Sequence, residues 1–129
     1  MRTETASPPA ALVRAELRHC LIGWHLDALV DDALLIVTEL VSNAVRHGAP
    51  PVSVRIRRTR DEDGQESLLL EVEDTGPGID VAWARAHWRH PSYTFTEGGR
   101  GLFIVNALAD SWGDTAHARG HTTWARLTV

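Results

Sequence analysis

The chain has 129 residues and a formal net charge of −4 at pH 7. This length fits one domain, and the acidic balance argues against a general nucleic-acid or anionic-membrane binder, because such proteins need excess positive charge. All 13 basic residues are arginine. The lack of lysine excludes three kinds of site that need an amine: a Walker-type P-loop, a protein kinase of the Gly-rich-loop class and a Schiff-base enzyme.

The first third of the chain predicts two helices. Residues 1–8 are polar and predict a loose tail or a short edge strand, and residues 9–129 predict a single domain. An apolar stripe predicts a helix over residues 10–24. The residues of that stripe are Leu12, Val13, Leu17, Cys20 and Leu21.

A longer helix is predicted over residues 27–47, because Gly48 and the prolines after it are strong stop signals. The expected core face carries Val30, Ala33, Leu34, Val37, Val41 and Ala44. The opposite side carries Asp32, Glu39, Asn43 and Arg46.

Alternation of apolar and polar residues predicts a strand over residues 52–57. Residues 58–66 predict a charged hairpin loop, and residues 67–73 a second strand that runs directly into Asp74. These two strands are expected to pair as a hairpin with one buried face.

The last third of the chain predicts a short helix over residues 81–88, then a loop that reaches the glycines before Arg100. A further helix is expected over residues 102–111. Two final strands are expected over residues 112–118 and 122–129. Trp112 and Trp124 fall on these strands and are expected in the core.

Glu39 and Asn43 lie four residues apart on the long helix, so their side chains share one face. The amide oxygen can join a Mg²⁺ shell, which prefers hard oxygen ligands. The carboxylate can accept a proton from an incoming hydroxyl. A solvated helix face is the commoner explanation of such a pair when it stands alone.

The segment from Asp74 to Gly78 follows a strand directly. It can be a strand-ending turn with permissive glycines, or a nucleotide site. An aspartate here can accept a hydrogen bond from the exocyclic amine of adenine, whereas guanine presents a carbonyl oxygen. Polar groups on loops at strand ends favour binding sites.

Glycines also precede the helix predicted over residues 102–111, at Gly98, Gly99 and Gly101, with Arg100 between them. Free backbone amides at a helix N-terminus bind phosphate, with the helix dipole behind them. Arg100 could add positive charge. A flexible loop before an ordinary helix start is the alternative.

In this order, the segments resemble the GHKL (Bergerat-fold) ATP-binding superfamily, which includes gyrase, histidine kinase and chaperone ATPase domains. The segments that carry the resemblance are residues 39–48, 74–79 and 98–102. The small size and the Asn-Ala-x-x-His-Gly ending at Gly48 look most like the anti-sigma-factor serine/threonine kinases of the RsbW type.

The resemblance implies an α/β (α+β) two-layer sandwich: a mixed, mostly antiparallel sheet with helices on one face, and residues 79–98 as a lid over ATP. Glu39 matches the catalytic general base and Asn43 the Mg²⁺ ligand, while Asp74 matches the adenine-reading aspartate. The implied cofactor-binding residues are Asn43, Asp74, Gly76, Gly78, Gly99, Arg100, Gly101 and Leu102.

The implied function is an ATP- and Mg²⁺-binding regulator that phosphorylates an anti-anti-sigma (STAS-type) partner on serine and also sequesters a sigma factor. A cytoplasmic homodimer is expected, with no nucleic-acid or membrane partner. Two alternatives stay open. One is a module in which ATP only switches partner affinity, and the other is a slow ATPase in which Glu39 orients water.

Overall fold

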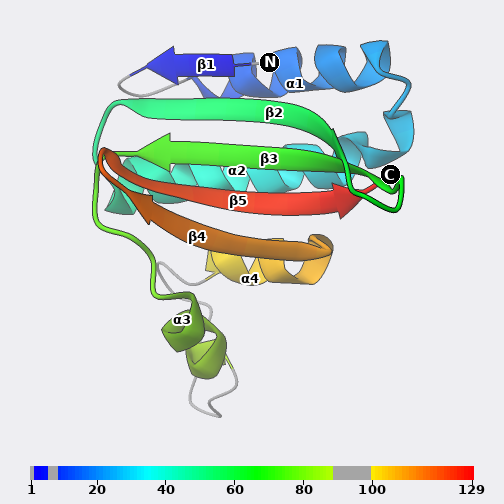
Figure 1. The fold of residues 1–129 in the computed structure, drawn as a ribbon. Helices are drawn as coiled ribbons and strands as arrows, with labels where there is room; N and C mark the ends of the chain where they lie inside the picture. Colours follow the sequence, from blue (N-terminus) through cyan, green and yellow to red (C-terminus); the bar gives the residue numbers. More distant parts are fainter. Residues whose placement is uncertain (1, 6–8, 89–99) are drawn as a thin grey trace.

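The computed structural model describes residues 2–5, 9–88 and 100–129. Five strands form one sheet in the order β1-β2-β3-β5-β4 (Figure 1). The strands are β1 Arg2–Thr5, β2 Val52–Arg60, β3 Glu66–Asp74, β4 Ser111–His117 and β5 Gly120–Thr128. All four pairings among these strands are antiparallel, where a mixed sheet was expected.

The helices α1 (Ala10–Gly23), α2 (Val30–His47) and α4 (Arg100–Leu108) lie on one face of this sheet, and a short 3₁₀ turn (Asp27–Leu29) precedes α2 (Figure 1). No described helix covers the other face, which is called the open face below. Helix α3 (Val81–Trp88) lies beyond the β4 edge. The α+β sandwich that the sequence predicts is therefore confirmed, and the N-terminal segment supplies the short edge strand rather than a loose tail.

The core lies between the inner sheet face and α2, which runs between α1 and α4. Because α2 has a helix on each side, it buries a wider arc than its sheet-facing stripe alone. Ile36 and Leu40, which the predicted stripe omits, are thus fully buried, whereas Leu34 is only half-buried. Leu12 of α1 is 49% exposed, contrary to its predicted place in the apolar stripe.

The two tryptophans of the last strands lie on opposite faces of the sheet. Trp112 is buried in the core, and its Nε1 donates a hydrogen bond to Oδ1 of Asn106 at 2.9 Å. Trp124 alternates with the buried Ala125, so it lies on the open face, against Gly113. The expectation that Trp124 is a core residue is wrong for this reason.

Among the described helices, none is both long and apolar enough to cross a membrane.

Candidate functional site

The carboxyl end of β3 meets the C-terminus of α2 and the β4–β5 turn at one end of the sheet, at the left of Figure 1. Asp74 is the last residue of β3 and is 2% exposed. Its Oδ1 accepts hydrogen bonds from the backbone N–H of Ala49, at 3.2 Å, and of Gly76, at 2.7 Å. Two backbone donors therefore fix this carboxylate in place.

The backbone packs closely against Asp74 at two glycines, where a larger residue would not fit. A Cβ on Gly48 would collide with the Asp74 carboxyl group, and a Cβ on Gly76 would lie 2.9 Å from its Oδ1. Thr75 completes the closure, since its N–H donates to Ala49 O and its hydroxyl to Pro50 O, both at 2.9 Å. The loop after α2 is thereby attached to the end of β3.

A buried histidine and a second aspartate also reach Asp74. Nε2 of His121 lies 2.9 Å from Oδ2 of Asp74, but the atoms are not aligned for a hydrogen bond. The other ring nitrogen, Nδ1, forms a short contact with Oδ1 of Asp114. Asp114 also accepts from the hydroxyl of Thr123 and from the N–H of Ile79, both at 3.0 Å.

Sequence reasoning missed His121 and Asp114. One signal could have found His121: it alternates in step with the buried Ala125 and Leu127, so its strand places it on the core side. A histidine on a buried strand face needs polar partners. Nothing local in the sequence identifies Asp114 as that partner.

Gly78 extends the same site toward β4. A Cβ on Gly78 would lie 2.8 Å from Oδ2 of Asp114, the oxygen that accepts from Ile79. The structure thus brings together Asp74, Gly76 and Gly78 as the sequence predicts. It adds Asp114, which lies next to Gly78.

A second region forms where α4 begins beside α2. A Cβ on Gly101 would lie 2.7 Å from Oε2 of Glu39, so the bare backbone of the first turn of α4 faces that carboxylate. Glu39 and Asn43 are both half-buried on α2, one turn apart. Leu102 is 5% exposed in the hydrophobic core, so its side chain anchors α4 and only its backbone is left for a ligand.

Three of the predicted features fall partly or wholly outside the described residues. Gly99 is outside them, and so is the second half of the expected lid, of which residues 79–88 are described. Arg100 is the first residue of α4, but its side chain is not described.

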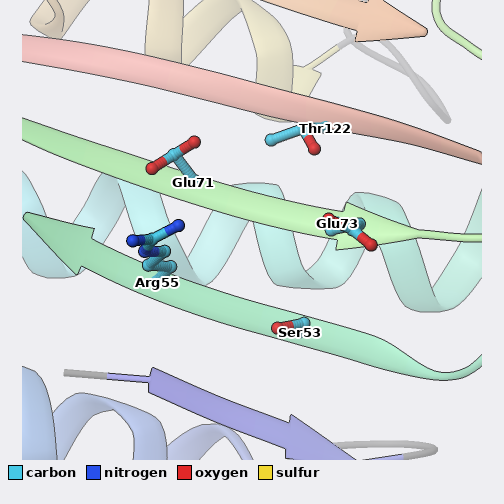
Figure 2. Close-up of a pocket in the computed structure, with 5 residues that line it drawn as sticks. All are labelled: Ser53, Arg55, Glu71, Glu73 and Thr122. Atoms are coloured by element: carbon cyan, nitrogen blue, oxygen red, sulfur yellow. The ribbon is translucent and has the colours of Figure 1, made fainter. Parts of the chain in front are cut away.

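A separate polar pocket lies on the open face of the sheet (Figure 2). Its volume is about 70 Å³, whereas small-molecule sites usually hold roughly 300–1,000 Å³. Its lining residues are Ser53, Arg55, Glu71, Glu73 and Thr122. They lie on the face opposite α2, so this pocket is not part of the site around Asp74.

Comparison with known families agrees with this arrangement. A family model described as the histidine kinase-like ATPase domain matches residues 5–129, and it includes both the Asp74 region and the Glu39 region. No curated protein matches the chain. The match implies that the protein binds ATP. The chain belongs to the histidine kinase-like ATPase domain family.

Proposed function

We propose that this protein is an ATP- and Mg²⁺-dependent serine/threonine kinase of the anti-sigma-factor type. The observation that carries the proposal is the meeting of Glu39 with the first turn of α4, in a chain whose family binds ATP. A carboxylate beside a helix N-terminus places a proton acceptor next to a site suited to phosphate.

Asp74 is the proposed reader of the base. Both bonds from backbone N–H groups go to Oδ1, so Oδ2 is the oxygen left for a ligand. An ionised carboxylate only accepts hydrogen bonds. It therefore suits the exocyclic amine of adenine and disfavours the carbonyl oxygen of guanine, which selects ATP over GTP.

Glu39, Asn43 and the start of α4 are the proposed phosphate end. Bound ATP with Mg²⁺ would supply the γ-phosphoryl group. Glu39 would take the proton of a serine hydroxyl as the serine oxygen bonds to the γ-phosphorus, while the bond from that phosphorus to the β–γ bridging oxygen breaks and ADP leaves. Asn43 would offer its amide oxygen to the ion, and the backbone near Gly101 would hold the phosphates.

Arginine must supply any permanent positive charge that a side chain brings to this end, because the chain has no lysine. Arg46 lies in the last turn of α2 and is exposed, and Arg100 begins α4. Either could offset the charge that develops on the transferred group.

The proposed partners follow from the likeness to anti-sigma-factor kinases. They are a STAS-type anti-anti-sigma protein, which would carry the serine, and a sigma factor, which the protein would sequester. We propose that it acts as a cytoplasmic homodimer. The chief rival is a binding module that holds ATP without transferring phosphate, and a slow ATPase is the second.

The first test concerns the base. Asp74→Asn replaces one oxygen by an amide nitrogen that cannot accept from adenine, so ATP binding should be abolished or weakened by about 100-fold. Isothermal titration calorimetry with ATP and GTP measures this. Glu73→Gln is the matched control, since Glu73 is the preceding residue on the opposite sheet face. Normal ATP affinity in Asp74→Asn would remove Asp74 from the site.

The second test concerns phosphate transfer. Glu39→Ala should still bind ATP but transfer no phosphate to a purified anti-anti-sigma protein, followed by radiolabelled ATP and by mass spectrometry of the serine. If wild-type protein binds ATP but labels no serine, the binding-module alternative replaces the kinase. If ATP is consumed without a labelled partner, the slow ATPase replaces it.

A further inference from the structure

Three ionisable side chains are buried in contact at the end of the sheet, one from each of three strands. The side chains of Asp74 on β3 and His121 on β5 are each 3% exposed, and that of Asp114 on β4 is 5% exposed. Burial of charged groups is costly unless they are paired and hydrogen-bonded. Packing alone therefore does not explain why these three ionisable groups are buried together.

Asp114 fixes the orientation of the imidazole ring. Its Oδ2 accepts from the N–H of Ile79, and its Oδ1 accepts from the hydroxyl of Thr123 and contacts Nδ1 of His121. A carboxylate that already receives these donors acts as an acceptor, so Nδ1 of His121 carries a proton and donates it. This turns the other nitrogen, Nε2, toward Asp74.

The contact between Nε2 and Asp74 then requires a second proton. With Nδ1 protonated, a neutral ring would present the lone pair of Nε2 to Oδ2 of Asp74 at 2.9 Å. Two buried acceptors in contact repel each other and lose their hydrogen bonds. A proton on Nε2 removes this conflict and reduces the charge of the buried cluster from −2 to −1, since one imidazolium then lies between two carboxylates.

We propose that His121 is a positioning residue of the nucleotide site: held by Asp114, it is an imidazolium that forms an ion pair with Oδ2 of Asp74. This rests on the proposed function, in which Asp74 reads the base. The imidazolium holds Oδ2 of Asp74 and directs the remaining lone pair of that oxygen toward the base amine. Without the proton on Nε2 of His121, Nε2 and Oδ2 of Asp74 repel each other. The Asp74 carboxylate is then no longer held in one orientation.

The other charged groups near this cluster do not take over its role. Glu73 lies on the opposite sheet face, where its Oε2 is 3.7 Å from Nε2 of His117. Arg46 and His47, in the last turn of α2, are exposed. Within the described part of the chain, the ion pairs of His121 are those with Asp74 and Asp114.

The protonation state can be observed directly in the full chain. Histidine labelled with ¹⁵N gives distinct ring shifts for a neutral tautomer and an imidazolium, and His121→Gln assigns the signal by its loss. We expect the ring shifts of His121 in the folded protein to be those of an imidazolium. A neutral ring there would overturn the proposal, and this measurement does not depend on whether any variant folds.

Nucleotide binding gives the functional test, by calorimetry of ATP between about pH 6 and about pH 8.5. His121→Leu removes the donor and should weaken ATP binding by about tenfold, a size typical for loss of a residue that orients a ligand-binding group. His121→Gln keeps a neutral N–H donor, so it should largely restore affinity, but any pH dependence that wild type owes to the His121 proton should be absent from this variant. This variant also supplies the baseline for titration of the ATP phosphates.

Two further variants separate positioning from general stability. Asp114→Asn should weaken ATP binding as His121→Leu does, because the ring loses its anchor. His117→Gln alters an exposed histidine of the same hairpin and should keep both the affinity and the pH profile of wild type. A wild-type pH profile in His121→Gln would overturn the proposal.

Failure of this inference differs from failure of the proposed function. If Asp74→Asn abolishes ATP binding while His121→Leu and Asp114→Asn bind like wild type, His121 has no positioning role and Asp74 remains the reader. If Asp74→Asn binds ATP normally, the site assignment itself is wrong, and with it the basis of this inference.

Discussion

The two ends of strand β3 each carry a carboxylate, and they hold it in opposite ways. At the start, Glu66 is half-exposed and paired with Arg58 and Arg60, both at 3.0 Å. At the end, Asp74 is buried and held by backbone N–H groups and a histidine. Exposed ion pairs contribute little to stability, because water and salt screen them. A buried carboxylate is costly unless it is paired and hydrogen-bonded, so the contacts around Asp74 should matter more to folding than those of Glu66.

The largest expected effect is on stability, and it concerns the glycine of the turn beside Asp74. Gly120 has φ +144°, and a Cβ there would collide with the carbonyl oxygen of Asp74 and lie 2.6 Å from Cα of Thr75. We expect Gly120→Ala to lower the free energy of unfolding by about 2–4 kcal/mol, measured by urea denaturation.

Gly64, in the turn that precedes Glu66, is the matched control. Its φ is +85°, but no atom lies within 4 Å of a Cβ there. Gly64→Ala should therefore cost only about 1 kcal/mol, from backbone conformation alone. Equal losses in the two variants would show that the contacts at the Asp74 end do not matter.

A smaller effect, measured on ligand binding, is expected at the C-terminus of α2. Gly48 has an ordinary φ of −95°, so Gly48→Ala tests the contact alone. The methyl group would overlap the Asp74 carboxyl group and turn it aside. ATP binding by calorimetry should weaken by about tenfold.

Gly23, the last residue of α1, provides the comparison, since a Cβ there has no atom within 4 Å. It belongs to the Glu66 end of the sheet, where Arg58 donates to the carbonyl of the neighbouring Trp24 at 3.4 Å. Gly23→Ala should bind ATP as wild type does. A loss shared by both variants would point to helix ends in general rather than to Asp74.

The smallest expected effect depends on pH, and it lies at the Glu66 end. The backbone N–H and the hydroxyl of Thr128 donate to Asp110 and lower the pKa of its carboxyl group. A pKa that folding lowers gives stability that is present above the unfolded pKa of about 3.9 and lost as pH falls through the folded pKa. Asp110→Asn should therefore lower Tm by about 1–3 °C near neutral pH, and the difference should shrink as pH falls through the lowered folded pKa.

Glu66→Gln tests the same kind of pH dependence at an exposed carboxylate that arginines hold. Hydrogen bonds from Arg60 and then Arg58 lower the pKa of the Glu66 carboxyl group, so the sign of the pH dependence is the same. Because this group is exposed, about 0.5 M salt should erase its contribution but not that of Asp110, which a backbone group holds. Salt dependence of equal size in both variants would contradict this distinction.

Most of the fold and part of the site could be predicted from the sequence because their signals are local. The alternation in β2 and β3 and the stop at Gly48 set the element boundaries within a few residues. The Asp-x-Gly-x-Gly order after β3 places Asp74 beside permissive glycines in any fold. The errors at Leu12 and Trp124 came from face assignment, which depends on what each element packs against.

The sequence by itself determined that this chain has the motifs of a lysine-free ATP site, with Glu39, Asn43 and Asp74 in family order. Only the tertiary structure decided what holds Asp74. Because β5 inserts between β3 and β4, its register places His121 opposite Asp74, and β4 brings Asp114 to the other side of the ring. These three side chains meet through strand order and register, which no local pattern encodes.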